Sequence, residues 1–251
     1  MNITGIPAFS DNYIWCLEQD GQAVVVDPGD ARPVFDHLAS RGATLAAILI
    51  THHHGDHAGG IAGLVRRFDV PVFGPATEDI AGVTVKVREG DTVPVPQIDA
   101  EFSVIEVPGH TLGHVAYYRP NHLFCGDTLF ACGCGRLFEG TPAQMFASLA
   151  RLAALPGDTQ VFCAHEYTQS NIRFAMAVEP DNRRLIDRAS AVNALRDAGL
   201  PSVPSTIETE RQTNPFLRAG EPAVSAAARA HGAGDSPVTV FAALREWKNR
   251  F

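Results

Sequence analysis

The segment at residues 51–57, THHHGDH, constrains this chain more than any other part of the sequence. It follows residues 45–50, a short apolar run bounded by polar residues, which is typical of a buried strand. Imidazoles and carboxylates are the usual ligands of Zn²⁺, Fe²⁺ and Mn²⁺, and burying so many of them without a cation would be costly. The segment therefore predicts a metal site at the end of a strand.

The spacing inside this segment favours two metal positions over one. His52 and His54 can point the same way where the chain is still extended, because side chains alternate along a strand. Asp56 and His57 are adjacent in the sequence, so their side chains diverge. A structural alternative is that Asp56 is only the acidic group at the start of a helix predicted over residues 58–68.

Three further metal-binding side chains, His110, Asp127 and His165, stand just past the ends of other predicted strands. Ligands in open α/β sheets gather where the carboxyl ends of strands give way to loops, so separate strand ends can converge on one point. If Asp127 bridges, the seven donors provide four protein ligands for each of two ions. That arrangement is typical of a two-metal hydrolytic centre.

The rest of the pattern predicts an α/β protein with helices covering sheets. Further strands are predicted over residues 23–26, 102–107, 122–125 and 160–163, and helices over 33–41 and 142–154. Beyond His165 the strand signal nearly vanishes, and helices are predicted over 168–178, 182–198, 221–231 and 237–249. We therefore expect two domains, residues 1–166 and 167–251.

Charge divides the chain at the same place. The net charge is -8 overall; residues 1–166 hold 9 Lys/Arg against 19 Asp/Glu (net -10), and residues 167–251 hold 11 against 9 (net +2). This balance argues against nucleic acid or an anionic membrane as the main partner. It leaves room for a small anion bound by the mildly cationic C-terminal part.

Cysteine usage and the N-terminal residues indicate a cytoplasmic protein. The five cysteines form no CxxC pair and leave an odd count, which favours reduced thiols. The first residues show no basic segment followed by an apolar core, so no signal peptide is predicted. The longest apolar run, residues 45–50, is too short to cross a bilayer.

Four motifs in this order, HHHGDH, PGHTLGH, GDTLF and AHEYT, resemble the metallo-β-lactamase superfamily. The longer stretches GDTLFACGCGRLFEGT, HEYTQSN and TNPFLR narrow the resemblance to glyoxalase II, the hydroxyacylglutathione hydrolases. The resemblance covers nearly the whole chain. It implies an αββα sandwich with a binuclear metal site, followed by a small helical domain that helps to bind glutathione thioesters.

The resemblance also implies which side chains hold the metals and what the protein does. His52, His54 and His110 would hold one ion, Asp56, His57 and His165 the other, and Asp127 would bridge them. Two divalent ions per chain are implied, with zinc the first expectation and iron or manganese also suited to such ligands. Asp56 and Asp127 are the catalytic candidates. The expected reaction is hydrolysis of S-D-lactoylglutathione to D-lactate and glutathione, the second step of methylglyoxal detoxification.

Five further residues are implied to contact the substrate. Arg136 stands where the family places a basic residue for the glycine carboxylate of glutathione, and Tyr167 matches a substrate-contacting tyrosine. Arg245 and Lys248 match the family's C-terminal cations and lie three apart on the last predicted helix, hence on one face. Phe138 departs from the family, which commonly has tyrosine there. The structural alternative for each cation is a solvated surface charge.

Three other functions remain open from the sequence. One is a persulfide dioxygenase of the same superfamily, which acts on glutathione persulfide with one iron. Another is a hydrolase for a β-lactam or a phosphodiester, and the third is a metal-stabilised binding domain without catalysis. The preferred hypothesis expects a small glutathione thioester as the only partner, with no nucleic acid, no membrane and a monomeric chain.

Overall fold

The computed structural model describes all residues 1–251 and divides them into two compact units. The first unit consists of residues 1–106 and 113–126, and the second of residues 107–112 and 127–251. The domain boundary predicted near residue 166 falls inside the second unit and stays a prediction. No helix is both long enough and apolar enough to cross a membrane.

The first unit contains a six-stranded sheet in the order β1-β2-β3-β4-β5-β6. Its first three strands are antiparallel, and β3 to β6 run parallel. The strands are β1 (Asn2–Ala8), β2 (Asn12–Gln19), β3 (Gln22–Val26), β4 (Thr44–Leu49), β5 (Val72–Pro75) and β6 (Val85–Val87). Because β3 and β4 are parallel neighbours, the residues that follow them emerge at the same edge of the sheet.

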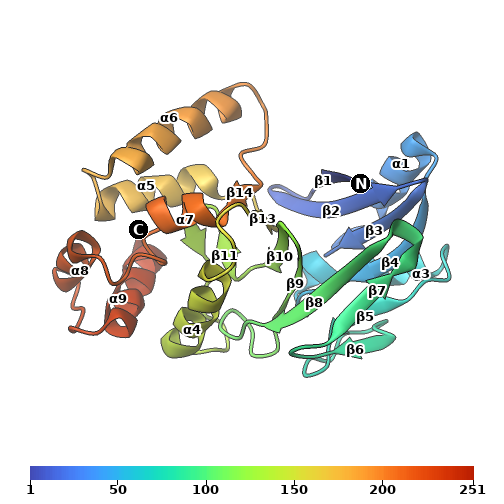
Figure 1. Cartoon of the computed structure of the whole chain (residues 1–251), viewed down its shortest axis with the longest axis horizontal. Helices are drawn as coiled ribbons and strands as arrows, with labels where there is room; N and C mark the ends of the chain where they lie inside the picture. Colours follow the sequence, from blue (N-terminus) through green and yellow to red (C-terminus); the bar gives the residue numbers. More distant parts are fainter. The chain divides into compact units, whose positions relative to one another are not determined.

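Helices α1 (Ala31–Arg41) and α3 (Ile61–Val65) cover one face of this sheet (Figure 1). Asp30 caps α1 by accepting a 2.9 Å hydrogen bond from the backbone N–H of Arg32, and the helix ends at Gly42 in the left-handed conformation. Buried aliphatic side chains from both helices pack against alternate residues of the strands, among them Val34, Leu38, Ile61, Leu64, Val25, Ile48 and Ile50. This packing fixes the loops that leave the strand ends.

The first unit also contains an antiparallel run in the order β10-β9-β8-β7. Its strands are β7 (Thr92–Val95), β8 (Ala100–Glu106), β9 (Val115–Arg119) and β10 (His122–Gly126), with the short 3₁₀ helix η1 (Pro96–Ile98) between β7 and β8. The buried Tyr117 of β9 donates a 2.9 Å hydrogen bond to the carbonyl of Ile50. This bond ties the antiparallel run to the end of β4, where the histidine-rich segment begins.

The second unit is mainly helical. Its helices are α4 (Pro142–Ala153), α5 (Thr168–Val178), α6 (Arg183–Asp197), α7 (Ile207–Thr213), α8 (Pro222–Arg229) and α9 (Pro237–Arg250). Its strands are the pair β11 (Leu129–Phe130) and β12 (Gly133–Cys134) and the pair β13 (Gln160–Cys163) and β14 (Ser205–Thr206). Helices α5 and α6 contact each other, and α9 contacts both α4 and α8 (Figure 1).

Most of the predicted elements are present, and the α/β class is confirmed. The prediction of a single helix over residues 58–68 is wrong. The chain instead forms two short helices, α2 (Gly55–Ala58) and α3, which are separated by Gly59 and Gly60. A Cβ atom at Gly60 would lie 2.3 Å from the carbonyl oxygen of Pro28, so this break brings two backbones into close approach. Helix α7 was not predicted, because the prolines around it indicated only connections.

Candidate metal centre

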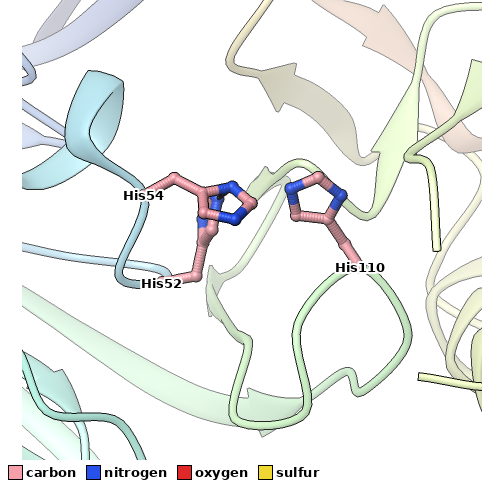
Figure 2. A group of neighbouring side chains, drawn as sticks. All are labelled: His52, His54 and His110. Carbon is pink, nitrogen blue, oxygen red and sulfur yellow. Dashed lines mark hydrogen bonds between the residues drawn. The ribbon is translucent and has the colours of Figure 1, made fainter. Parts of the chain in front are cut away.

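In the first unit, the segment after β4 gathers the donors that the sequence predicts. The Nε2 atom of the buried His52 lies 3.0 Å from Nδ1 of His54. Figure 2 shows these two side chains on the segment that follows β4; it also draws His110, which belongs to the second unit. Asp56 and His57 follow in the first turn of α2, with Oδ2 of Asp56 3.6 Å from Nε2 of His57.

Asp27, directly after β3, organises this segment. Its carboxylate accepts hydrogen bonds from the backbone N–H and the hydroxyl of Thr51, both at 2.7 Å, and lies 3.0 Å from Nδ1 of His57. A histidine that donates one ring N–H to a carboxylate presents its other nitrogen as a metal ligand. Asp27 therefore leaves Nε2 of His57 for a metal.

Other side chains of the first unit surround these donors. Asn12 donates a 3.0 Å hydrogen bond to Oδ2 of Asp56, and the buried His114 stacks on the ring of His52 with centroids 4.6 Å apart. His53 turns elsewhere, since its Nδ1 lies 3.0 Å from Oε2 of Glu78. The ring of His53 still meets that of His54 edge-on, with centroids 4.9 Å apart.

In the second unit, Asp127 lies between two histidines. Its Oδ2 is 3.4 Å from Nε2 of His110, and its Oδ1 is 3.3 Å from Nε2 of His165. One carboxylate oxygen thus faces each imidazole, an arrangement that allows the carboxylate to bridge two ions. The Nδ1–H of His110 can donate to the carbonyl of Arg136 at 2.8 Å, which directs Nε2 toward Asp127.

The donor spacing in both units fits divalent cations. Two ligand atoms about 2.0–2.2 Å from one tetrahedral ion lie roughly 3.3–3.6 Å apart. The four donor pairs above are separated by 3.0–3.6 Å. All of these side chains except His54 and Asp56 are buried, an environment in which such groups need a compensating charge. We conclude that each unit presents a metal-binding donor set.

A cavity of about 610 Å³ opens beside the donor set of the second unit. Its lining includes His110 and Asp127 together with all five residues that the sequence assigns to the substrate: Arg136, Phe138, Tyr167, Arg245 and Lys248. Arg173 lines it as well. The volume lies within the range of small-molecule sites, and the lining joins metal-binding groups to cations.

Two of the cavity cations project from α9. Arg245 is only 4% exposed, and its guanidinium donates a 2.8 Å hydrogen bond to the carbonyl of Cys134 and lies 5.0 Å from the ring centroid of Phe216. Its Nε is buried without a hydrogen-bond partner. Burial, then the charge of Arg245 and, to a smaller extent, the charge of Arg173 lower the pKa of Lys248 to about 8. Such a cavity favours an anionic ligand.

Aromatic rings complete the cavity. The ring of Tyr167 stacks on His165 at 4.7 Å with an interplanar angle of 4°. Phe138 is 63% exposed and meets the ring of His110 edge-on at 5.2 Å. Phenylalanine at this position provides a wall of the cavity but no hydroxyl for a hydrogen bond.

The thiols near the cavity are not nucleophiles. Burial raises the pKa of Cys132 to about 12 and also raises that of Cys134. Thiolates, not thiols, are the reactive form. All five cysteines are buried and free, as predicted.

Two residues of this region escaped the sequence interpretation. Asp27 carries the same signal as Asp127, an acidic residue directly after an apolar run, but the following Pro28-Gly29 suggested only a turn. Arg173 lies on α5 with no motif around it, and nothing in the sequence distinguishes it from other helical arginines.

Comparison with known proteins assigns the family. Residues 9–165 match the metallo-beta-lactamase superfamily, and residues 166–251 match the hydroxyacylglutathione hydrolase C-terminus. The hydroxyacylglutathione hydrolase of Nitrosomonas europaea is 51% identical across 100% of this chain and 97% of its own length. That of Cupriavidus metallidurans is 55% identical across 100% and 99%.

Among solved structures, TTHA1623 in a di-iron-bound form is similar, with a TM-score of 0.61 and 26% identity over 86% of this chain and 100% of that one. The metallo-β-lactamase fold and the helical C-terminal region inferred from the motifs are thereby confirmed. The chain belongs to the hydroxyacylglutathione hydrolase family of the metallo-β-lactamase superfamily.

Proposed function

We propose that this protein hydrolyses S-D-lactoylglutathione, and related S-2-hydroxyacylglutathiones, to the 2-hydroxy acid and glutathione. The observation that carries the proposal is the cavity of the second unit, which joins the donors His110 and Asp127 to the cations Arg245 and Lys248. A thioester of glutathione matches that lining, because it combines a reactive carbonyl with two carboxylates. The names of the relatives support the same reaction.

We assign the metal ligands from the chemistry of the two donor sets together with the family. His52, His54 and His110 would hold one ion, Asp56, His57 and His165 would hold the other, and Asp127 would bridge them. The two oxygens of Asp127, each facing a different histidine, support the bridging role. Zinc is the first candidate, and the di-iron form of a similar protein supports iron as an alternative.

Bound ions of this kind lower the pKa of a water toward neutrality and stabilise the charge that develops on a carbonyl oxygen. The chain itself positions the metal-binding carboxylates. Asn12 holds the carboxylate of Asp56 through Oδ2, and Asp127 is fixed between two imidazoles. The leaving group is a thiolate whose thiol has a pKa of roughly 8.5, so it departs without a proton donor. No general acid is therefore required in the cavity.

The cavity residues bind and position the glutathione portion. Its two carboxylates and one ammonium group leave it a net anion, which the cations of the cavity attract. Arg136 takes the glycine carboxylate with help from Arg245 and Lys248, and Tyr167 contacts the substrate beside His165. Phe138 adds apolar contact only. We further propose that the protein acts as a cytoplasmic monomer in the second step of methylglyoxal detoxification, without nucleic acid or membrane partners.

Incubating the metal-loaded protein with S-D-lactoylglutathione tests this function. We expect release of D-lactate and a free thiol in equal amounts, and loss of both after chelation, with activity restored by added metal. Oxygen uptake on glutathione persulfide without thioester hydrolysis would establish the dioxygenase instead. Cleavage of a β-lactam or a phosphodiester in preference to the thioester, or no turnover of any of them, would also overturn the proposal.

A further inference from the structure

The cavity of the second unit contains one more cation than the family resemblance assigns. Arg173, on α5, lines it together with Arg136, Arg245 and Lys248. Arg173 and Lys248 line the same cavity, and the charge of Arg173 makes a small contribution to lowering the pKa of Lys248. Arg173 is exposed, whereas Arg245 is buried.

None of these four cations forms an ion pair with an acidic side chain. Elsewhere in the same unit, arginines are paired: Arg188 with Glu210 at 2.6 Å, and Arg218 with Glu179 at 2.8 Å. A group of mutually repelling cations that are left without carboxylates is typical of a site that receives an anionic ligand. The only acidic residue of the lining, Asp127, faces His110 and His165.

The number of cations exceeds what one carboxylate needs. Glutathione has two carboxylates, on its glycine and on its γ-glutamyl residue, and the first is already matched by Arg136 and the two cations of α9. Arg245 is partly engaged by the carbonyl of Cys134, so it cannot serve both ends. A guanidinium with no partner of its own can accept a carboxylate through two parallel hydrogen bonds.

We propose that Arg173 binds the α-carboxylate of the γ-glutamyl residue and thereby selects thioesters of the complete tripeptide. This inference rests on the proposed function and deepens it. Arg173 lies five residues beyond the start of α5, whose N-cap is Tyr167, so one helix presents both a substrate-contacting ring and the second carboxylate site. Arg173 is not one of the metal donors, so we expect it to affect substrate binding and not the chemical step.

The test compares two substrates, S-D-lactoylglutathione and the S-D-lactoyl thioester of N-acetylcysteinylglycine, which lacks the γ-glutamyl group and whose acetylated nitrogen cannot take the lactoyl group from sulfur. With the metal-loaded protein, Arg173→Ala raises KM for the full thioester about 3- to 10-fold and leaves kcat within about twofold, as expected for a partly exposed charged contact. The same variant leaves KM for the truncated thioester unchanged. Arg173→Lys retains part of the affinity for the full thioester, because lysine keeps the positive charge but cannot form the two parallel hydrogen bonds of a guanidinium.

Arg184→Ala is the matched control, since it removes an exposed arginine from α6 that does not line the cavity. It leaves KM unchanged for both substrates. Equal KM for wild type and Arg173→Ala on the full thioester, or an equal rise on both thioesters, would overturn the assignment. Failure of the proposed function is a different result, in which the wild-type protein hydrolyses neither thioester.

Discussion

The metal donors and the cavity cations are held in different ways. The donors are fixed by buried hydrogen bonds from groups near strand ends, such as Asp27 on His57 and the carbonyl of Arg136 on His110. Three of the four cavity cations project from helices without acidic partners, Arg173 from α5 and Arg245 and Lys248 from α9. Two of them rest on aromatic rings, Arg245 on Phe216 and Lys248 on Phe174. Rigid placement suits groups that must hold ions, and unpaired charge suits groups that must receive a substrate. Variants of the first set should change kcat and metal content, and variants of the second should change KM.

The largest effect is expected at Asp127. Asp127→Asn keeps the size of the side chain but removes the charge that faces His110 and His165. We expect a loss of bound metal and a fall in kcat of about 10²- to 10⁴-fold, from metal analysis and steady-state kinetics. Asp158→Asn, at an exposed position of the same unit, should change neither. A full metal complement with normal kcat in Asp127→Asn would contradict the bridging role.

Asp27 should behave as a positioning residue for the same site. Asp27→Asn retains an oxygen for Thr51 but weakens the hold on Nδ1 of His57. Metal affinity should fall about 10- to 100-fold, which competition with a chelator measures, and excess metal should restore most of kcat. The exposed turn residue Asp20 provides a control through Asp20→Asn. If chelator sensitivity stayed at the wild-type level, Asp27 would have only a structural role.

The double variant Arg245→Ala with Lys248→Ala tests the cation side of the comparison. Removing both charges should raise KM for S-D-lactoylglutathione about 10- to 100-fold while metal content and kcat stay near wild type. Because Arg245 is buried, Arg245→Lys with Lys248→Ala serves as a companion variant that keeps one charge in the core. An unchanged KM in a folded double variant would remove these residues from the substrate site.

A smaller effect is expected from pH. The lowered pKa of Lys248, about 8, means that the side chain is cationic below that pH and neutral above it. An anionic substrate favours the cationic form, so kcat/KM should fall as pH rises through about 8, by roughly 3- to 10-fold. Lys248→Arg keeps its charge throughout this range and should remove that fall. A profile that is the same in both proteins would exclude Lys248 as its source.

The sequence predicts the donors better than the cavity because the donors share a local signal. Each follows a predicted strand, and parallel or neighbouring strand ends bring such residues together. The break between α2 and α3 was not predictable from periodicity, since it depends on the close approach of Gly60 to Pro28. Arg173 could not be separated from Arg184, because only the folded structure shows which of the two arginines lines the cavity with Lys248.

The most direct test of the binuclear account is to titrate the metal-free protein with Zn²⁺ while following hydrolysis of S-D-lactoylglutathione and counting bound ions per chain. The account predicts that activity rises until two ions are bound and then stays constant. Full activity at one ion per chain, or two bound ions without thioester hydrolysis, would contradict it.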